Sequence, residues 1–137
     1  GPGLTLSVGS SPELMGLGYE IKPVSPELLI RLINDLNRYN ARAIEVDDKR
    51  LSYNSAIRDI NGKTTINSEP IQNTDIEINI ITYTYEQAEK MKNHLLASSF
   101  QDEFYIDNLV LTIHEAEQNI QIDSVASVPR IKYLSEK

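Results

Sequence analysis

The chain has no cysteine among its 137 residues. Disulfides, zinc-thiolate sites and thiol redox chemistry are therefore excluded together. It also has no apolar run near the roughly 20 residues that a membrane-spanning helix needs, and no signal-peptide pattern at its start. We expect the given chain to be soluble by itself, although an ectodomain separated from a membrane anchor would have the same composition.

The chain has fewer basic than acidic residues. The 13 lysines and arginines are outnumbered by 20 aspartates and glutamates, which gives a formal net charge of -7. Such a surface repels phosphate backbones, and the basic residues form no visible cluster, so we expect no nucleic-acid partner. With 40% hydrophobic residues, residues 1–137 are expected to form a single globular domain with one core.

Two segments have the pattern of amphipathic helices. The first begins at Ser25-Pro26, where a hydroxyl N-cap is followed by proline at the first helical position, and ends near Asn40. The second begins at Thr84, whose spacing to Gln87 matches a capping box, and is expected to end near Ser98.

Alternating apolar and polar residues predict several strands. The clearest are 4–8, 76–80 and 109–113, and a further strand is predicted over 120–122, joined to the preceding one through a hairpin at 115–118. Two tight turns join additional strands. Asp47-Asp48 links 42–46 to 49–53, and Asn61-Gly62 precedes a short polar strand over 63–67.

Residues 9–22 and 130–137 lie outside this pattern. The first segment is predicted to be a long loop, which either packs Leu14, Met15 and Leu17 against the core or binds a partner. Residues 130–137 are predicted to be a charged tail.

This order of elements predicts the α+β class. Strand faces that are apolar on one side and polar on the other need helices on one side only. The simplest solution is a ferredoxin-like split β-α-β arrangement, a mainly antiparallel sheet with two helices packed on one face.

No constellation of residues indicates catalysis. His94 and His114 are the only histidines, and no metal-ligand spacing accompanies them, so surface or structural roles are expected. The acid pairs Asp47-Asp48 and Asp102-Glu103 are typical of solvated turns. Serines lack a nucleophile elbow, and the glycines form no phosphate-binding loop. We therefore expect no enzyme activity, no cofactor and no metal.

Arg50 and Arg58 are the candidate contacts for an anion. Both follow the predicted hairpin at Asp47-Asp48, and each guanidinium could hold a carboxylate or another anionic group. The alternative is an internal ion pair, for instance with Glu45, Asp47 or Asp59.

Short motifs spread along residues 1 to about 125 resemble the bacterial domain-of-unknown-function family 881. They are Gly1-Pro2-Gly3-Leu4, Ile33-Asn34-Asp35-Leu36, Ala41 to Val46, Arg50-Leu51, Ser55-Ala56-Ile57-Arg58, Ile66-Asn67 and Pro70-Ile71. The resemblance marks Gly1, Pro2, Gly3, Asn34, Arg50, Ser55, Arg58 and Asn67 as motif positions with structural or interaction roles. Gly1-Pro2 is equally explained as the remnant of a cleaved tag. Asn40 and Asp48 stand where the family commonly has glycine.

The resemblance implies an extracytoplasmic domain behind an N-terminal membrane span, in a family whose genes tend to neighbour cell-division genes and to which no enzyme activity is attached. We therefore expect a non-catalytic interaction or scaffolding domain, which acts as a homodimer or by binding envelope or cell-division proteins. The alternative is a small-molecule-sensing ferredoxin-like domain with an anion contact from Arg50 or Arg58. A third hypothesis, a hydrolase, requires a histidine to meet both a carboxylate and a nucleophile in space.

Overall fold

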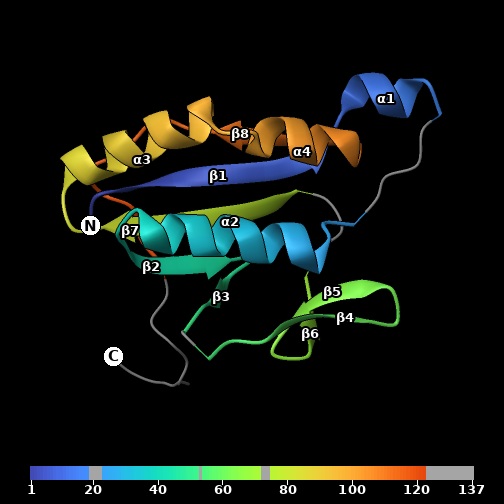
Figure 1. Ribbon diagram of the computed structural model, residues 1–137, viewed down its shortest axis with the longest axis horizontal. Coiled ribbons are helices and arrows are strands. Elements are labelled where there is room, and N and C mark those ends of the chain that lie inside the picture. The colour runs from blue at the N-terminus through green and yellow to red at the C-terminus, as the bar shows by residue number, and fades with distance from the viewer. Residues whose placement is uncertain (19–22, 53, 72–74, 123–137) are drawn as a thin grey trace.

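The computed structural model describes residues 1–18, 23–52, 54–71 and 75–122. Its main sheet has five strands in the order β3-β2-β7-β1-β8, and each neighbouring pair is antiparallel. The strands are β1 (Gly3–Ser10), β2 (Ala41–Val46), β3 (Lys49–Arg50), β7 (Ile76–Thr82) and β8 (Leu109–Ile113). Helices α2 (Pro26–Arg38), α3 (Tyr85–Ala97) and α4 (Phe100–Ile106) lie on one face of this sheet (Figure 1).

The chain order explains this layout. Helix α2 connects β1 to β2, and α3 with α4 connects β7 to β8, while the strand order places β7 and β1 in the centre. The order and directions of these four strands agree with the predicted split β-α-β arrangement. The α+β class is therefore confirmed.

The predicted alternation of the strands is confirmed. Leu4, Leu6 and Val8 of β1 are buried beneath the helices, as are Ile76, Ile78 and Ile80 of β7. The opposite face carries polar side chains. There Thr5 donates a hydrogen bond to Asn79, and Asn79 donates one to Glu45.

Both predicted helix starts are confirmed. The Ser25 hydroxyl accepts a hydrogen bond of 3.1 Å from the amide of Leu28, and Pro26 occupies the first helical turn. Thr84 and Gln87 form the predicted capping box at the start of α3. Each interaction satisfies a backbone amide that the first helical turn leaves without a partner.

The residues at the predicted helix end and turns have left-handed backbone conformations. Asn40, which follows α2, has φ 70°, and Asp47 and Asp48 have φ 50° and 65°. Asn61 and Gly62 are also left-handed, with φ 53° and 81°. Asn40 and Asp48 are the positions where the resembling family commonly has glycine, and glycine adopts this conformation at least cost.

A second sheet is inserted between β3 and β7. It consists of β4 (Ile57–Ile60), β5 (Lys63–Ile66) and β6 (Glu69–Pro70) in that spatial order. Ile66 and the following Ile71 are buried in the common core, and the Thr64 hydroxyl donates to the carbonyl of Val24. The small sheet lies below α2 in Figure 1, beside the main sheet.

The predicted loop over 9–22 is wrong in part. Strand β1 continues to Ser10, and α1 (Pro12–Gly16) forms a short helix directly after it. Leu17 does not pack against the core, because 73% of its surface is exposed. Residues 19–22 lie outside the described part of the chain.

The predicted strand over 120–122 is also wrong. After β8 the chain continues along β1, where Glu117 forms a two-way backbone bridge with Gly3 and the amide of Ile120 donates to Gly1. A hairpin at 115–118 would have paired the following residues with β8. Glu117 and Ile120 pair instead with the start of the chain, at Gly3 and Gly1.

Two further differences concern element lengths. Helix α4 was not predicted, although Phe100 and Phe104 bury one of its faces. Strand β3 covers only the first two residues of the predicted 49–53, and Tyr53 lies outside the described residues, as do residues 130–137.

Candidate functional site

A cleft of about 620 Å³ lies between α2, strand β2 and the segment from Arg50 to Ile57. Its apolar lining comes from Ile30, Ile33, Ala43, Ile44, Leu51 and Ile57. Its polar lining comes from Asn34, Asn37, Arg42, Arg50, Ser52 and Ser55. A volume of this size, mainly apolar with a few polar groups, is typical of small-molecule binding sites.

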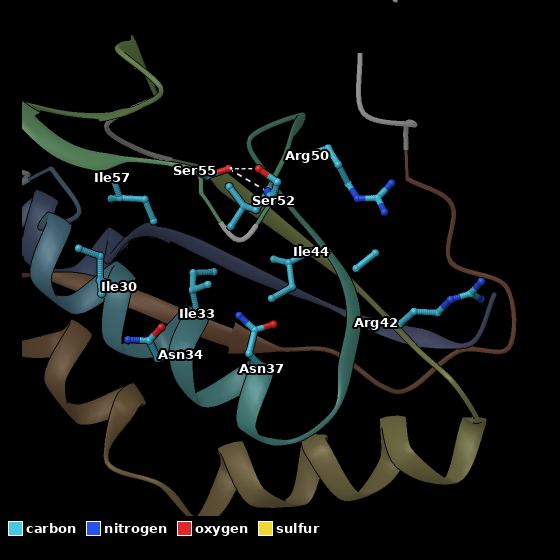
Figure 2. Close-up of a pocket in the computed structure, with 12 residues that line it drawn as sticks. Ile30, Ile33, Asn34, Asn37, Arg42, Ile44, Arg50, Ser52, Ser55 and Ile57 are labelled. Carbon is cyan, nitrogen blue, oxygen red and sulfur yellow. Dashed lines mark hydrogen bonds between the residues drawn. The ribbon is translucent and has the colours of Figure 1, made fainter. Parts of the chain in front are cut away.

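Figure 2 shows how these side chains are distributed about β2. Ile33, Ile44 and Asn37 lie on one side of the strand, and the guanidinium groups of Arg42 and Arg50 extend on the other. Both arginines line the cleft, and in this view their guanidinium groups lie across β2 from Ile33, Ile44 and Asn37. Arg42 also lies over the ring of Tyr83, with 5.7 Å from its guanidinium carbon to the ring centroid.

Ser52 and Ser55, which both line the cleft, are hydrogen bonded to each other. The amide of Ser52 donates to the Ser55 hydroxyl over 2.8 Å, and the amide of Ser55 donates to the Ser52 carbonyl over 3.0 Å. Asn67 on the neighbouring strand end accepts from the amide of Ala56 with its side chain and donates to the Ala56 carbonyl with its backbone. Ser55 and Asn67 thus position this part of the cleft lining, which is the structural role expected of motif residues.

The structure brings three of the predicted motif residues together. Asn34, Arg50 and Ser55 all line the cleft. Arg58, which is exposed on β4, does not line it. Of the two proposed anion contacts, Arg50 is therefore at the cleft and Arg58 is not.

The motif at the start of the chain has a packing role elsewhere. The carbonyl of Pro2 accepts a hydrogen bond of 2.8 Å from the amide of Thr82, at the end of β7. A Cβ atom on Gly3 would lie 1.8 Å from the carbonyl oxygen of Ile80, so no other residue fits there without movement of the backbone. Gly1 pairs on the opposite side of the chain, where its carbonyl accepts from the amide of Ile120.

Two cleft residues were not identified from the sequence. Asn37 lies one helical turn after Asn34 on α2, so the three-residue spacing was a signal that could have found it. Arg42 reaches the cleft at a break in strand register between Ala41 and Ala43, and no sequence signal marked that irregularity.

The two histidines occupy separate sites. His94 of α3 contacts Asp35 of α2, with 2.6 Å between Nε2 and Oδ2, and its ring stacks on Tyr39 at 3.7 Å. His114 contacts the Ser7 hydroxyl, with 2.8 Å between Nε2 and Oγ. Among the described residues, His94 therefore contacts a carboxylate and His114 contacts a hydroxyl, at two separate places. In the same ranges, no three His, Asp or Glu side chains lie close enough together to hold a metal ion.

Comparison with known proteins agrees with this architecture and these motifs. Residues 1–135 match the bacterial family of unknown function DUF881. The chain belongs to this family. The DUF881 chain is 28% identical over 136 residues to the UPF0749 protein YlxX of Bacillus subtilis, an alignment that covers 97% of this chain and 56% of the relative. It thus spans about half the length of that curated relative.

A solved structure is also similar to this DUF881 chain. It is the crystal structure of an uncharacterized conserved protein from Mycobacterium tuberculosis, with a TM-score of 0.60 and 18% identity. The match covers 93% of this chain and 89% of the other. At this identity the comparison shows the fold alone.

The DUF881 sheet has a second feature that concerns partners, which is the outer edge of β8. This strand pairs with β1 along one side, and it is the last strand of the sheet among the described residues. The Gln101 side chain of α4 reaches this strand and donates to the carbonyl of Leu111 over 3.1 Å. Thr112 and Val110 are exposed on the polar face of the sheet.

An ion pair links the helices of the DUF881 domain. Both terminal guanidinium nitrogens of Arg31 in α2 donate to the Glu103 carboxylate in α4, and the Ser99 hydroxyl donates to the same carboxylate. The hydrogen bond from Arg31, with a smaller effect from Ser99, lowers the pKa of Glu103 below its ordinary value. The same bond raises the pKa of Arg31.

No helix in the described ranges combines the length and the apolar character needed to cross a bilayer.

Proposed function

We propose that this DUF881 chain is a non-catalytic interaction domain that acts by self-association or by binding a partner protein. The observation that supports the proposal is the open edge of β8. An unpaired strand edge presents a row of backbone donors and acceptors that can pair with a strand of another chain.

Comparison of the described strand edges singles out β8. Strand β3 is only two residues long, and both residues are cationic. In the small sheet, β4 carries Arg58 and Asp59, and β6 consists of Glu69 and Pro70. Short length, charge and proline are devices that protect edges from association. Strand β8, with the sequence Leu-Val-Leu-Thr-Ile, has none of them.

The proposal is tested by sedimentation velocity over a wide range of protein concentrations. We expect the weight-average mass to rise from monomer toward dimer with concentration, because a homodimer with closed symmetry is the commonest oligomer. A monomer mass at every concentration up to the hundreds of micromolar would contradict self-association.

We propose further that the domain lies outside the cytoplasm, behind a membrane anchor, and serves the cell envelope or cell division. This step rests on the family resemblance. Protease treatment of intact bacterial protoplasts that carry the full-length protein tests the location. Digestion of the domain before lysis is expected, and complete protection until lysis would contradict the proposal.

The cleft supports a second candidate function, the sensing of a small amphiphilic anion. Six apolar residues line it, and Arg50 is one of its polar lining residues. A ligand that binds only the folded state raises the melting temperature. In a thermal-shift screen of fatty acids and alkyl phosphates, we expect a positive shift that Arg50→Ala reduces.

Arg58→Ala provides the matched control for this screen. It removes the same guanidinium from a neighbouring exposed position that does not line the cleft. Equal shifts for both variants, or no shift for any compound, would contradict an anion contact at Arg50.

A further inference from the structure

We propose that β8 pairs with β8 of a second copy of this chain, antiparallel and about a two-fold axis at Leu111, and that Gln101 opposes this pairing as an internal cap. The inference rests on the proposed self-association and goes further by naming the surface and the partner. Pairing of β8 with its copy would join the main sheets of the two chains into one continuous sheet, with all helices on the same side.

The hydrogen bonds to β1 determine which backbone groups of β8 face outward. In an antiparallel ladder, opposite residues alternate between pairs that exchange both backbone hydrogen bonds and pairs that exchange none. The amide of His114 donates to Thr5, so this pair is of the bonded kind. By the register of β1 and β8, Thr112 and Val110 also bond to β1.

The backbone groups of the intervening residues therefore point away from β1. These residues are Leu109, Leu111 and Ile113. The bond from Gln101 to the Leu111 carbonyl agrees with this assignment, because it reaches the strand from its outer side.

This set of outward groups is symmetric about its centre. With the axis at Leu111, that residue pairs with its own copy, and Leu109 pairs with Ile113 of the second copy. Every outward donor of the strand then meets an outward acceptor. Isologous contacts of this kind close after two copies.

Side chains also favour a second copy. Across the axis, Val110 would lie opposite Thr112 of the other copy on the polar face, and neither carries a charge. The whole chain has a net charge of -7, so most other surfaces would oppose self-association through like charges. Strand β8 is an uncharged stretch on this acidic molecule.

Gln101 occupies the middle of the proposed interface. Its amide nitrogen lies 3.1 Å from the Leu111 carbonyl oxygen, and a pairing strand would lie about 4.8 Å from β8. The Leu111 carbonyl oxygen can accept a second hydrogen bond. Gln101 therefore opposes the pairing mainly because its side chain occupies the space that the second strand needs. Displacement of this side chain is required before the strands meet.

Charge variants at the edge test the pairing by sedimentation. We expect Val110→Lys with Thr112→Lys, and likewise Val110→Glu with Thr112→Glu, to raise the dimer dissociation constant about tenfold or more, because like charges then oppose each other across the axis. An equal mixture of the two double variants is expected to restore a dimer. Leu96→Lys, at an exposed site on α3, is the control and should dimerise as the parent chain does.

The outcomes separate this inference from the proposed function. A lysine double variant that is folded by circular dichroism and dimerises like the parent chain would overturn the β8 interface and leave self-association standing. A mixture that stays monomeric would also overturn it. A parent chain that is monomeric at every concentration would overturn the β8 dimer and self-association together, and would leave only the partner-binding form of the proposed function.

Gln101→Ala tests the cap separately. Its loss is expected to lower the dissociation constant about two- to tenfold, which corresponds to the net free energy of one hydrogen bond. Gln118→Ala makes the same chemical change at an exposed position after β8 and should have no effect. An unchanged or higher dissociation constant for Gln101→Ala would overturn the role of Gln101.

Discussion

Gly3 shows at the scale of one residue why a motif position admits no side chain. Its Cβ would overlap the Ile80 carbonyl at 1.8 Å, inside the pairing of β1 with β7. We expect Gly3→Ala to lower the free energy of unfolding by about 1–3 kcal/mol, the usual cost of overpacking. Urea unfolding measures this change.

The control is Gly16→Ala, at the end of α1. A Cβ there would meet nothing within 4 Å. We expect little change or a slight gain in stability, because alanine has the higher helix propensity. Equal losses in the two variants would contradict the assigned overlap at Gly3.

The places of the helix end at Asn40 and of the two tight turns were predicted well from the sequence. Asn40, Asp48 and Gly62 all lie in the left-handed region, because asparagine, aspartate and glycine tolerate it best. The role of Arg58 was not predictable in the same way. Its place depends on where β4 passes relative to α2, which is a long-range property that no local motif contains.

Helices α2 and α4 are linked by the contact of Arg31 with Glu103, and this link depends on pH. Because the pKa of Glu103 is lowered in the folded state, the contribution is present above the ordinary pKa of glutamate and is lost as the pH falls through the lowered value. We expect Glu103→Gln to be less stable than the parent chain near neutral pH. The difference should shrink as the solution is acidified below pH 4.

Urea unfolding at several pH values measures this difference. Glu69→Gln makes the same substitution at an exposed position on β6. It should show no comparable loss at neutral pH. A difference for Glu103→Gln that stays constant or grows on acidification would contradict the assigned role of the pair.

Elements with strong periodicity and caps were predicted, and short or edge elements were not. The capping box placed the start of α3, and its predicted end near Ser98 agrees with the observed end at Ala97. Helix α4 has only seven residues, too few to repeat an apolar pattern. The error at 120–122 arose because alternation indicates an extended segment but not which backbone it will contact.

For the whole molecule, the sequence predicted the layers and not the cleft. Strands with one apolar and one polar face require a sheet that is covered by helices on one side and exposed to solvent on the other. Strands β1 and β7 form such a sheet. The cleft depends on how α2 packs beside Ser52 and Ser55, so the sequence could mark Asn34, Arg50 and Ser55 without showing that they share one space.

Self-association through β8 has a consequence for the stability of the whole molecule. A dimer that forms only from folded chains stabilises the folded state, so its melting temperature must rise with protein concentration. For the parent chain, we expect a rise of a few degrees over a hundredfold increase in concentration, measured by differential scanning calorimetry. The variant with Val110→Lys and Thr112→Lys should show a smaller rise over that range, since like charges weaken the pairing of its edge with a copy of itself. A parent chain whose melting temperature is independent of concentration would contradict a coupling between folding and association.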